Sequence, residues 1–183
     1  MTVKSVCVFC GSRPGNQPIF MAEAADVGRM LASHGWRLVY GAGDVGLMGA
    51  TARAAQEAGA KTFGVIPQHL MDREVGKADL TELHVTQTMH ERKELMFKSS
   101  DAIVVLPGGA GSLDEFFEVL TWRQLGLHKK PILLLNTDEY WQPLMAMIGH
   151  VIAHGFADGS ILDFVQVVGN VQELSGALRK ALS

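Results

Sequence analysis

Two cations in the segment from Met89 to Met96 lie where an amphipathic helix usually carries apolar residues. Arg92 and Lys93 fall on the helical stripe that Met89 and Met96 share, which is the side that packs against a core. A cation on that side is costly unless it has a fixed partner, such as a bound phosphate or an inward carboxylate. The alternative is that both side chains bury only their methylenes and keep their charges in water. The spacing therefore marks Arg92, and after it Lys93, as candidates for binding an anion. The polar stripe of the same helix is formed by Glu91, Glu94 and Lys98.

Glu115 is the carboxylate best placed to do chemistry. Ser112 and Glu115 have the spacing of a capping box, in which the serine begins a helix and the glutamate bonds back to its backbone. That spacing alone favours a structural role. The Gly-Gly-Ala-Gly run at 108–111 favours a ligand instead, because the backbone N–H groups that a cap satisfies could hold phosphate or ribose. One carboxylate cannot fill both roles, so cap and site remain alternatives.

Four loops follow predicted strands, at 10–15, 41–46, 64–67 and 107–112, and three of them are rich in glycine. Glycine lets the backbone approach a ligand closely, and the helix that follows aims free N–H groups at an anion. These loops predict a phosphate site, although each could also be a tight turn. The loop at 41–46 has the sequence G-x-G-x-x-G, which suggests a nicotinamide-dependent oxidoreductase. That alternative is disfavoured because the next strand ends in Ile66-Pro67-Gln68 without the acidic residue that would bind the ribose.

Along the sequence, short apolar runs alternate with longer amphipathic stretches, and this order is typical of a parallel sheet with helices between its strands. We expect one domain, 1–183, with a doubly wound, Rossmann-like sheet of about seven mainly parallel strands flanked by helices. Ligands of such sheets bind beyond the carboxyl ends of the strands. The predicted strands are Val3–Phe9, Arg37–Tyr40, Thr62–Ile66, Glu82–Thr86, Ala102–Leu106, Pro131–Leu135 and Phe164–Val168. The predicted helices are Ile19–His34, Leu47–Ala58, Met89–Ser99, Leu113–Leu125, Tyr140–His154 and Val171–Leu182.

Composition narrows the class of partner. The 183 residues carry a formal net charge of −3, and the isoelectric point is near 6.1. We therefore expect no nucleic acid polymer as ligand. No apolar run approaches a membrane span and the start of the chain does not resemble a signal peptide, so we expect a cytoplasmic protein that does not bind membranes. Cys7 and Cys10 spell C-x-x-C, but residues three apart in a strand face opposite ways, which predicts ordinary buried cysteines.

The motifs together resemble the Lonely Guy family of cytokinin-activating phosphoribohydrolases, long mislabelled as lysine decarboxylases. The similarity is carried by the sequence PGGAGSLDE at 107–115 and MHERK at 89–93, and it extends nearly end to end. Further matching segments are FCGS at 9–12, YGAG at 40–43, GLMG at 46–49, GVIP at 64–67 and TWRQLG at 121–126. Ser112 stands where the family usually has Thr, Ala42 replaces a common Gly, and Ala110 replaces a frequent aromatic residue.

This resemblance implies hydrolysis of an N6-modified adenosine 5′-monophosphate, or of AMP itself, to free base and ribose 5-phosphate. It implies a homodimer that needs no metal and no organic cofactor, with Arg92 and Glu115 as the catalytic residues. Glu115 would stabilise an oxocarbenium-like ribose or orient the attacking water, and Arg92 would anchor phosphate or assist the departing base. A pyridoxal-dependent decarboxylase and a non-catalytic nucleotide sensor are the rival functions. The substrate-binding positions are Ser12, Glu74, Lys93, Gly108, Gly109, Ala110, Gly111, Ser112, Leu113, Asp114 and Thr121; for a prenyl pocket the candidates are Met21, Met89 and Phe116.

Overall fold

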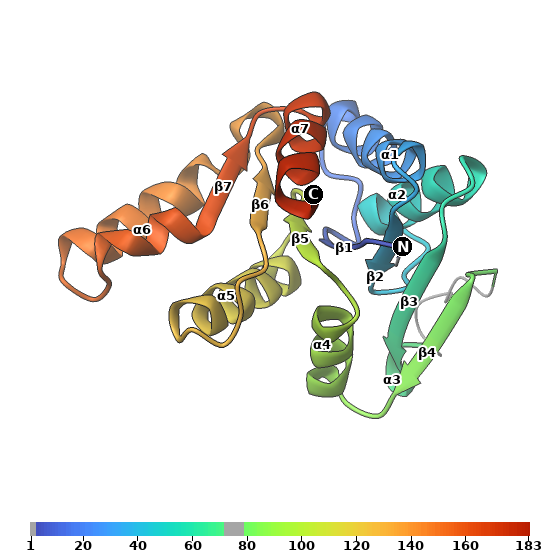
Figure 1. The fold of residues 1–183 in the computed structure, drawn as a ribbon, viewed down its shortest axis with the longest axis horizontal. Helices are drawn as coiled ribbons and strands as arrows, with labels where there is room; N and C mark the ends of the chain where they lie inside the picture. The colour runs from blue at the N-terminus through green and yellow to red at the C-terminus, as the bar shows by residue number, and fades with distance from the viewer. Residues whose placement is uncertain (1–2, 72–78) are drawn as a thin grey trace.

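A seven-stranded parallel sheet runs through the structure, a computed structural model that describes residues 3–71 and 79–183 (Figure 1). The strands lie side by side in the order β4-β3-β2-β1-β5-β6-β7. Their bounds are β1 Ser5–Phe9, β2 Arg37–Tyr40, β3 Thr62–Pro67, β4 Glu82–Thr86, β5 Ala102–Val105, β6 Ile132–Leu135 and β7 Val165–Val168. The chain builds outward from β1 in one direction and then from β5 in the other, which confirms the predicted doubly wound, Rossmann-like sheet.

Helices cover both faces of this sheet, as Figure 1 shows. One face carries α1 (Pro18–Ser33), α2 (Gly46–Glu57) and α7 (Val171–Leu182), and the other carries α4 (Met89–Lys98), α5 (Ala110–Gln124) and α6 (Gln142–Ala153). The shorter elements are α3 (Gln68–Met71), η1 (Thr137–Glu139) and η2 (Gly159–Phe164). Of the helices that the structure describes, none combines the length and apolar character needed to cross a bilayer.

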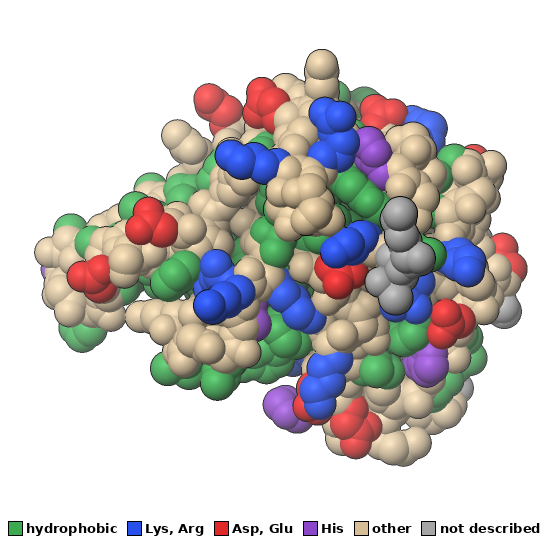
Figure 2. All heavy atoms as spheres, in the orientation of Figure 1, with side chains coloured by type: hydrophobic (Ala, Val, Ile, Leu, Met, Phe, Trp, Pro, Cys, Tyr) green, Lys and Arg blue, Asp and Glu red, His purple; other side chains and the backbone are tan. Residues whose placement is uncertain are grey.

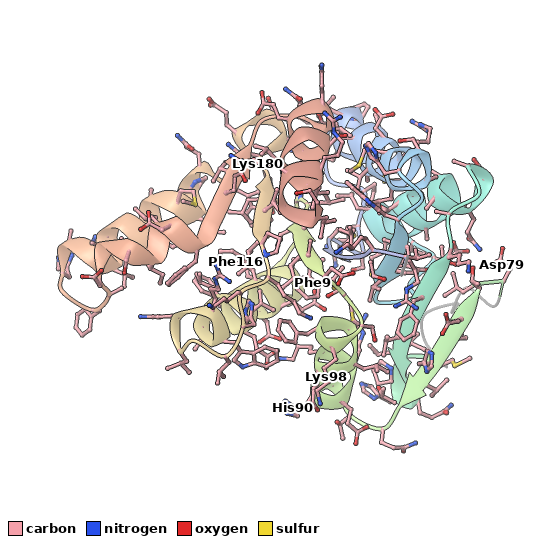
Figure 3. The ribbon with its side chains drawn as sticks, viewed as in Figure 1. Phe9, Asp79, His90, Lys98, Phe116 and Lys180 are labelled. Carbon is pink, nitrogen blue, oxygen red and sulfur yellow. The ribbon has the colours of Figure 1, made fainter. Side chains whose placement is uncertain are left out.

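The central strands are buried along their whole length because they are covered on both sides. Alternate residues of β1 enter different cores, with Val8 in the α1–α2–α7 core and Phe9 in the α4–α5–α6 core, which also contains Phe116 (Figure 3). Cys7 and Cys10 are divided in the same way. Both are buried free thiols, which confirms the prediction that they are ordinary core cysteines.

Helix α5 begins at Ala110, three residues earlier than the sequence predicts. Its N-cap is Gly109, which provides no side-chain cap, so Ser112 lies inside the first turn. Of the two alternatives for Ser112 and Glu115, the capping box is therefore wrong, because the glycine-rich run itself forms the start of the helix. A capping box forms instead at the start of α4, where the Thr88 side chain accepts from the Glu91 backbone at 3.1 Å and Glu91 accepts from the Thr88 backbone at 3.2 Å.

Strands β1 and β5 are neighbours, yet their following loops lead to helices on opposite faces of the sheet. This is the switch point at which doubly wound sheets open a crevice. The two loops are joined across it by a hydrogen bond from the Gly11 backbone to the Pro107 carbonyl, at 3.0 Å. The two loops are therefore in direct contact at the crevice.

Candidate functional site

A cavity of about 590 Å³ lies at the carboxyl ends of β1 and β5. Its size is in the range of small-molecule sites. One wall is formed by the loop after β1, another by the start of α5, and Arg92 and Tyr140 reach in from elsewhere in the chain. The apolar part of the lining includes the large side chains of Phe20, Leu47, Met48 and Met89.

The start of α5 supplies the cavity's anion-binding backbone. The first N–H groups of a helix have no partner within it, and here the N-cap residue Gly109 offers no side chain to satisfy them. Ala110, Gly111 and Ser112 all line the cavity. The free N–H groups and the positive end of the helix dipole thus meet at the place where a phosphate would bind.

The loop at 41–46 does not contribute a second anion site. The Gly11 carbonyl accepts from the backbone N–H groups of Leu47 and Met48, at 3.0 and 3.4 Å, and so occupies the start of α2. Of the two alternatives left open for each glycine-rich loop, this one is therefore a tight turn. Its G-x-G-x-x-G sequence supports the loop after β1, and the helix end that a dinucleotide would use is occupied by protein.

Arg92 is buried, with 7% of its surface exposed, and its guanidinium is held by the ends of two strands. Nε donates to the Val65 carbonyl at 3.1 Å and Nη2 donates to the Gly41 carbonyl at 2.9 Å. Gly41 makes this approach possible, because a Cβ on it would lie 2.0 Å from Nη2. Nη1 lies 4.0 Å from the Met89 sulfur, a weak acceptor, and the ion pairs of the described residues include none on Arg92. The guanidinium charge at the cavity is therefore not matched by a carboxylate and can bind an anionic ligand.

Glu115 lies half-buried in the same cavity, and the hydrogen bonds of the described residues include none to its carboxylate. Burial raises the pKa of Glu115 to about 7, and the neighbouring carboxylates of Asp114 and Glu118 add to this effect. The positive charges of Arg92 and Lys93 oppose the rise without cancelling it. The group can therefore exchange a proton near neutral pH, as acid–base catalysts must.

Lys93 points inward as predicted, and of the two expected kinds of partner, phosphate or carboxylate, the structure shows carboxylates. Nζ lies 3.0 Å from Asp114 and 3.0 Å from Glu118, and 15% of the side chain is exposed. Burial lowers the pKa of Lys93, but the two carboxylates outweigh that effect and the pKa is raised. Lys93 is absent from the lining of the cavity, so here it ties α4 to the second and third turns of α5.

The structure brings most of the predicted site residues together. Ser12, Gly108, Gly109, Ala110, Gly111, Ser112 and Asp114 line the cavity with Arg92 and Glu115. Leu113 packs against the core and Thr121 is exposed about three turns along α5. Glu74 lies outside the described residues. Of the three side chains suggested for a prenyl pocket, Met89 lines the cavity, whereas Met21 and Phe116 pack in the cores.

Sequence reasoning missed three polar residues of the cavity, namely Arg13, Asn16 and Tyr140. The first two lie in or next to a loop whose composition did mark the site. Tyr140 comes from a segment with no glycine signature, after β6, where the two preceding residues adopt positive φ. Nothing in the local sequence indicates that this turn bends back to the crevice.

Fold and site together define a Rossmann-like α/β protein with a nucleotide-sized cavity at its switch point. A family model described as "Possible lysine decarboxylase" matches residues 48–178. A cytokinin riboside 5′-monophosphate phosphoribohydrolase of Rhodococcoides fascians is 45% identical over 179 residues, which cover 97% of this chain and 90% of that protein. LOG3 of Arabidopsis thaliana, with the same enzyme name, is 40% identical over 171 residues, 93% of this chain and 80% of that protein. The chain belongs to this family, which confirms the Lonely Guy resemblance.

Two solved structures share the whole fold. The molybdenum cofactor carrier protein of Chlamydomonas reinhardtii matches with a TM-score of 0.75 and 23% identity, covering 99% of this chain and 98% of that one. The molybdenum cofactor binding protein of Rippkaea orientalis matches with a TM-score of 0.74 and 21% identity, covering 100% and 99%. At these identities the likeness concerns the fold, and function has to be argued from the site.

Proposed function

We propose that this protein hydrolyses the N-glycosidic bond of adenosine 5′-monophosphates, plain or modified at N6, to the free base and ribose 5-phosphate. The observation that carries the proposal is the meeting of Arg92, Glu115 and the uncapped start of α5 in one cavity. The names of the relatives at 40–45% identity support the same reaction. The apolar part of the cavity suits the base and an apolar N6 group.

Phosphate binding falls to the start of α5. The N–H groups of Ala110, Gly111 and Ser112 and the hydroxyl of Ser112 would hold the 5′-phosphate. The Ser12 side chain, on the opposite wall, would share in binding phosphate or ribose. This arrangement predicts that nucleosides without a 5′-phosphate are poor substrates, because they lose the interaction that places the ribose.

Glu115 would act at the anomeric carbon. Cleavage of the bond builds positive charge on the ribose ring and negative charge on the departing base, so a carboxylate near C1′ stabilises the transition state or orients the attacking water. Both actions require the ionised form. Because the carboxylate has no hydrogen-bond partner among the described residues, its charge is available to the substrate.

Arg92 would provide the positive counterpart. Its guanidinium is fixed by two carbonyl oxygens, so it needs little reorganisation when a negative charge develops nearby. A donor in this position can anchor the phosphate or neutralise the leaving purine. An Arg92→Lys variant separates the two roles: a higher KM with kcat retained indicates anchoring, and a lower kcat indicates action on the leaving base.

A product assay tests the proposal. The purified protein is incubated with AMP, with N6-isopentenyl AMP and with the two corresponding nucleosides, and free base is measured by chromatography. We expect base from the nucleotides and little from the nucleosides, with release abolished or strongly reduced in Glu115→Gln. Binding of both nucleotides without release of base from either would instead establish a nucleotide sensor, and the hydrolase proposal would fail.

We further propose that the protein is a homodimer. Exposed apolar side chains lie just after α5, on α6 and on the turn after α6, and Figure 2 shows green patches in the lower left part of the molecule. Leu125, Leu127, Met147 and Phe156 are between 57% and 86% exposed. Sedimentation equilibrium should give twice the chain mass, and Met147→Glu should shift the protein towards monomer. A monomeric wild type at micromolar concentration would refute the dimer.

A further inference from the structure

Tyr140 contacts the glycine-rich loop of the site from a distant part of the chain. Its hydroxyl donates to the Gly108 carbonyl at 2.6 Å, and the residue also lines the cavity. The ring packs edge-on against Phe20, with 5.7 Å between ring centroids. The hydroxyl is thus fixed at the peptide that comes just before the first turn of α5.

The turn that presents Tyr140 is held in an unfavourable backbone conformation. The two preceding residues, Asp138 and Glu139, have φ values of 49° and 58°, which side-chain-bearing residues seldom adopt. Asp138 is tied to the start of α1 by a hydrogen bond from the Gln17 amide, at 2.7 Å. Such conformations persist when the surroundings enforce them, and they concentrate at functional sites.

The Gly108–Gly109 peptide is the part of the loop most able to turn over. Rotating a peptide plane by half a turn changes φ of the following residue by the same amount, which would take Gly109 from −97° to about +80°. Glycine tolerates both values. The rotation exchanges the carbonyl oxygen with the N–H on the other side of the plane, so a donor to an anion is replaced by an acceptor that repels it.

We propose that Tyr140 is a positioning residue that holds the Gly108–Gly109 peptide in its anion-binding orientation. By accepting the phenol's hydrogen bond, the Gly108 carbonyl is turned toward Tyr140 and its negative dipole is satisfied. In this proposal the Gly109 N–H, on the opposite side of the peptide plane, joins the N–H groups of Ala110, Gly111 and Ser112 as a donor to the anion. The inference rests on the proposed function for the identity of the anion, the 5′-phosphate of the substrate.

The test measures phosphate affinity apart from turnover. Binding of ribose 5-phosphate and of adenine is measured by calorimetry for the wild type and Tyr140→Phe, which keeps the ring and removes the hydroxyl. Losing one hydrogen bond should weaken ribose 5-phosphate roughly three- to ten-fold, with adenine affinity and Tm unchanged. In the enzyme assay, KM for AMP should rise by a similar factor with little change in kcat.

A second variant separates peptide control from direct contact with substrate. Gly109→Ala disfavours the turned peptide because positive φ is strained for alanine, and a Cβ on Gly109 meets no atom within 4 Å. Adding Tyr140→Phe to Gly109→Ala should therefore weaken ribose 5-phosphate less than two-fold. Equal losses in both backgrounds would overturn the proposal, because the hydroxyl would then act directly on the ligand.

The two proposals fail in different ways. If the wild type releases base but Tyr140→Phe binds ribose 5-phosphate as tightly as the wild type, the role of Tyr140 is refuted and the hydrolase stands. If no base is released but Tyr140→Phe still weakens ribose 5-phosphate, the hydrolase is refuted and Tyr140 remains the residue that controls the anion site. A wild type that binds no ribose 5-phosphate would refute the anion site and the role of Tyr140 with it.

Discussion

Replacing Gly41 with alanine should displace the Arg92 side chain, although Gly41 itself does not line the cavity and every side chain that does is kept. A Cβ on Gly41 would lie 2.0 Å from Nη2 and 3.0 Å from Cζ of Arg92, both well inside van der Waals contact. Ordinary contacts between heavy atoms are roughly 3.5 Å or longer, so the guanidinium must move by more than about 1 Å to relieve the clash. It then loses its 2.9 Å hydrogen bond to the Gly41 carbonyl.

The expected magnitude follows from that lost bond. A hydrogen bond to a buried charged group is worth about 1.5 to 3 kcal/mol. If the same amount is lost from transition-state stabilisation, kcat/KM falls roughly ten- to a hundred-fold. The free energy of unfolding should fall by a similar amount, and Tm by about 4 to 10 °C.

The assay compares kcat/KM for AMP and Tm for Gly41→Ala and for Gly176→Ala, a control in α7 where an added Cβ meets no atom within 4 Å. The control should keep its activity, and its Tm should stay the same or rise, because alanine favours a helix interior more than glycine does. A double-mutant cycle decides the mechanism: in an Arg92→Gln background, Gly41→Ala should lower kcat/KM less than three-fold. A full additional loss in that background would show that Gly41 acts by some route other than Arg92, and the reasoning would be wrong.

Four further predictions concern the charges and the backbone of the site. Glu115→Gln should lower kcat at least a hundred-fold, and wild-type kcat/KM should rise with pH through about 7 as Glu115 loses its proton, a rise that the variant lacks. Because folding raises the pKa of the Glu115 carboxyl, its ionisation lowers the stability of the folded protein as the pH rises from 4.5 to 7. At pH 8 the free energy of unfolding of Glu115→Gln should therefore exceed that of the wild type, by at most about 3 kcal/mol, and its Tm should be higher. At pH 4 the variant should have no such advantage. Lys93→Met removes a charge that lowers the pKa of Glu115, so the pH profile should move to higher pH, whereas Lys93→Arg should leave it in place. Ala42 is buried with φ of 60°, so Ala42→Val should lower Tm by more than about 5 °C and Ala42→Gly should not lower it, which thermal unfolding would check.

The sheet was predictable from sequence because each strand carries its own signal. The runs at 102–106 and 131–135 are almost wholly apolar, and such runs separated by helices form parallel sheets. The inward direction of Arg92 followed from helical spacing in the same way. These inferences succeeded because burial in a layered fold imposes a period on the sequence.

The start of α5 was not predictable on the same basis. Ser112 and Glu115 have the spacing of a cap, but the glycines before them can join the helix, and local sequence does not decide between the two outcomes. Tyr140 was missed because it reaches the cavity only through the turn at Asp138 and Glu139, whose positive φ values cannot be predicted from the local sequence. Lys93 was recognised as inward, yet its carboxylate partners became visible only when α4 and α5 were placed together.

The attachment of Arg92 to Gly41 and Val65 means that the two candidate catalytic groups belong to different halves of the molecule. The guanidinium moves with the ends of β2 and β3, while Glu115 moves with the helix that follows β5. A displacement of one half relative to the other would change the distance between the Arg92 guanidinium and the Glu115 carboxylate. The ion pairs of Lys93 with Asp114 and Glu118 restrain such a displacement because they link α4 to α5. Concentrated salt, which weakens ion pairs by screening, should therefore lower kcat at concentrations well below those that unfold the protein.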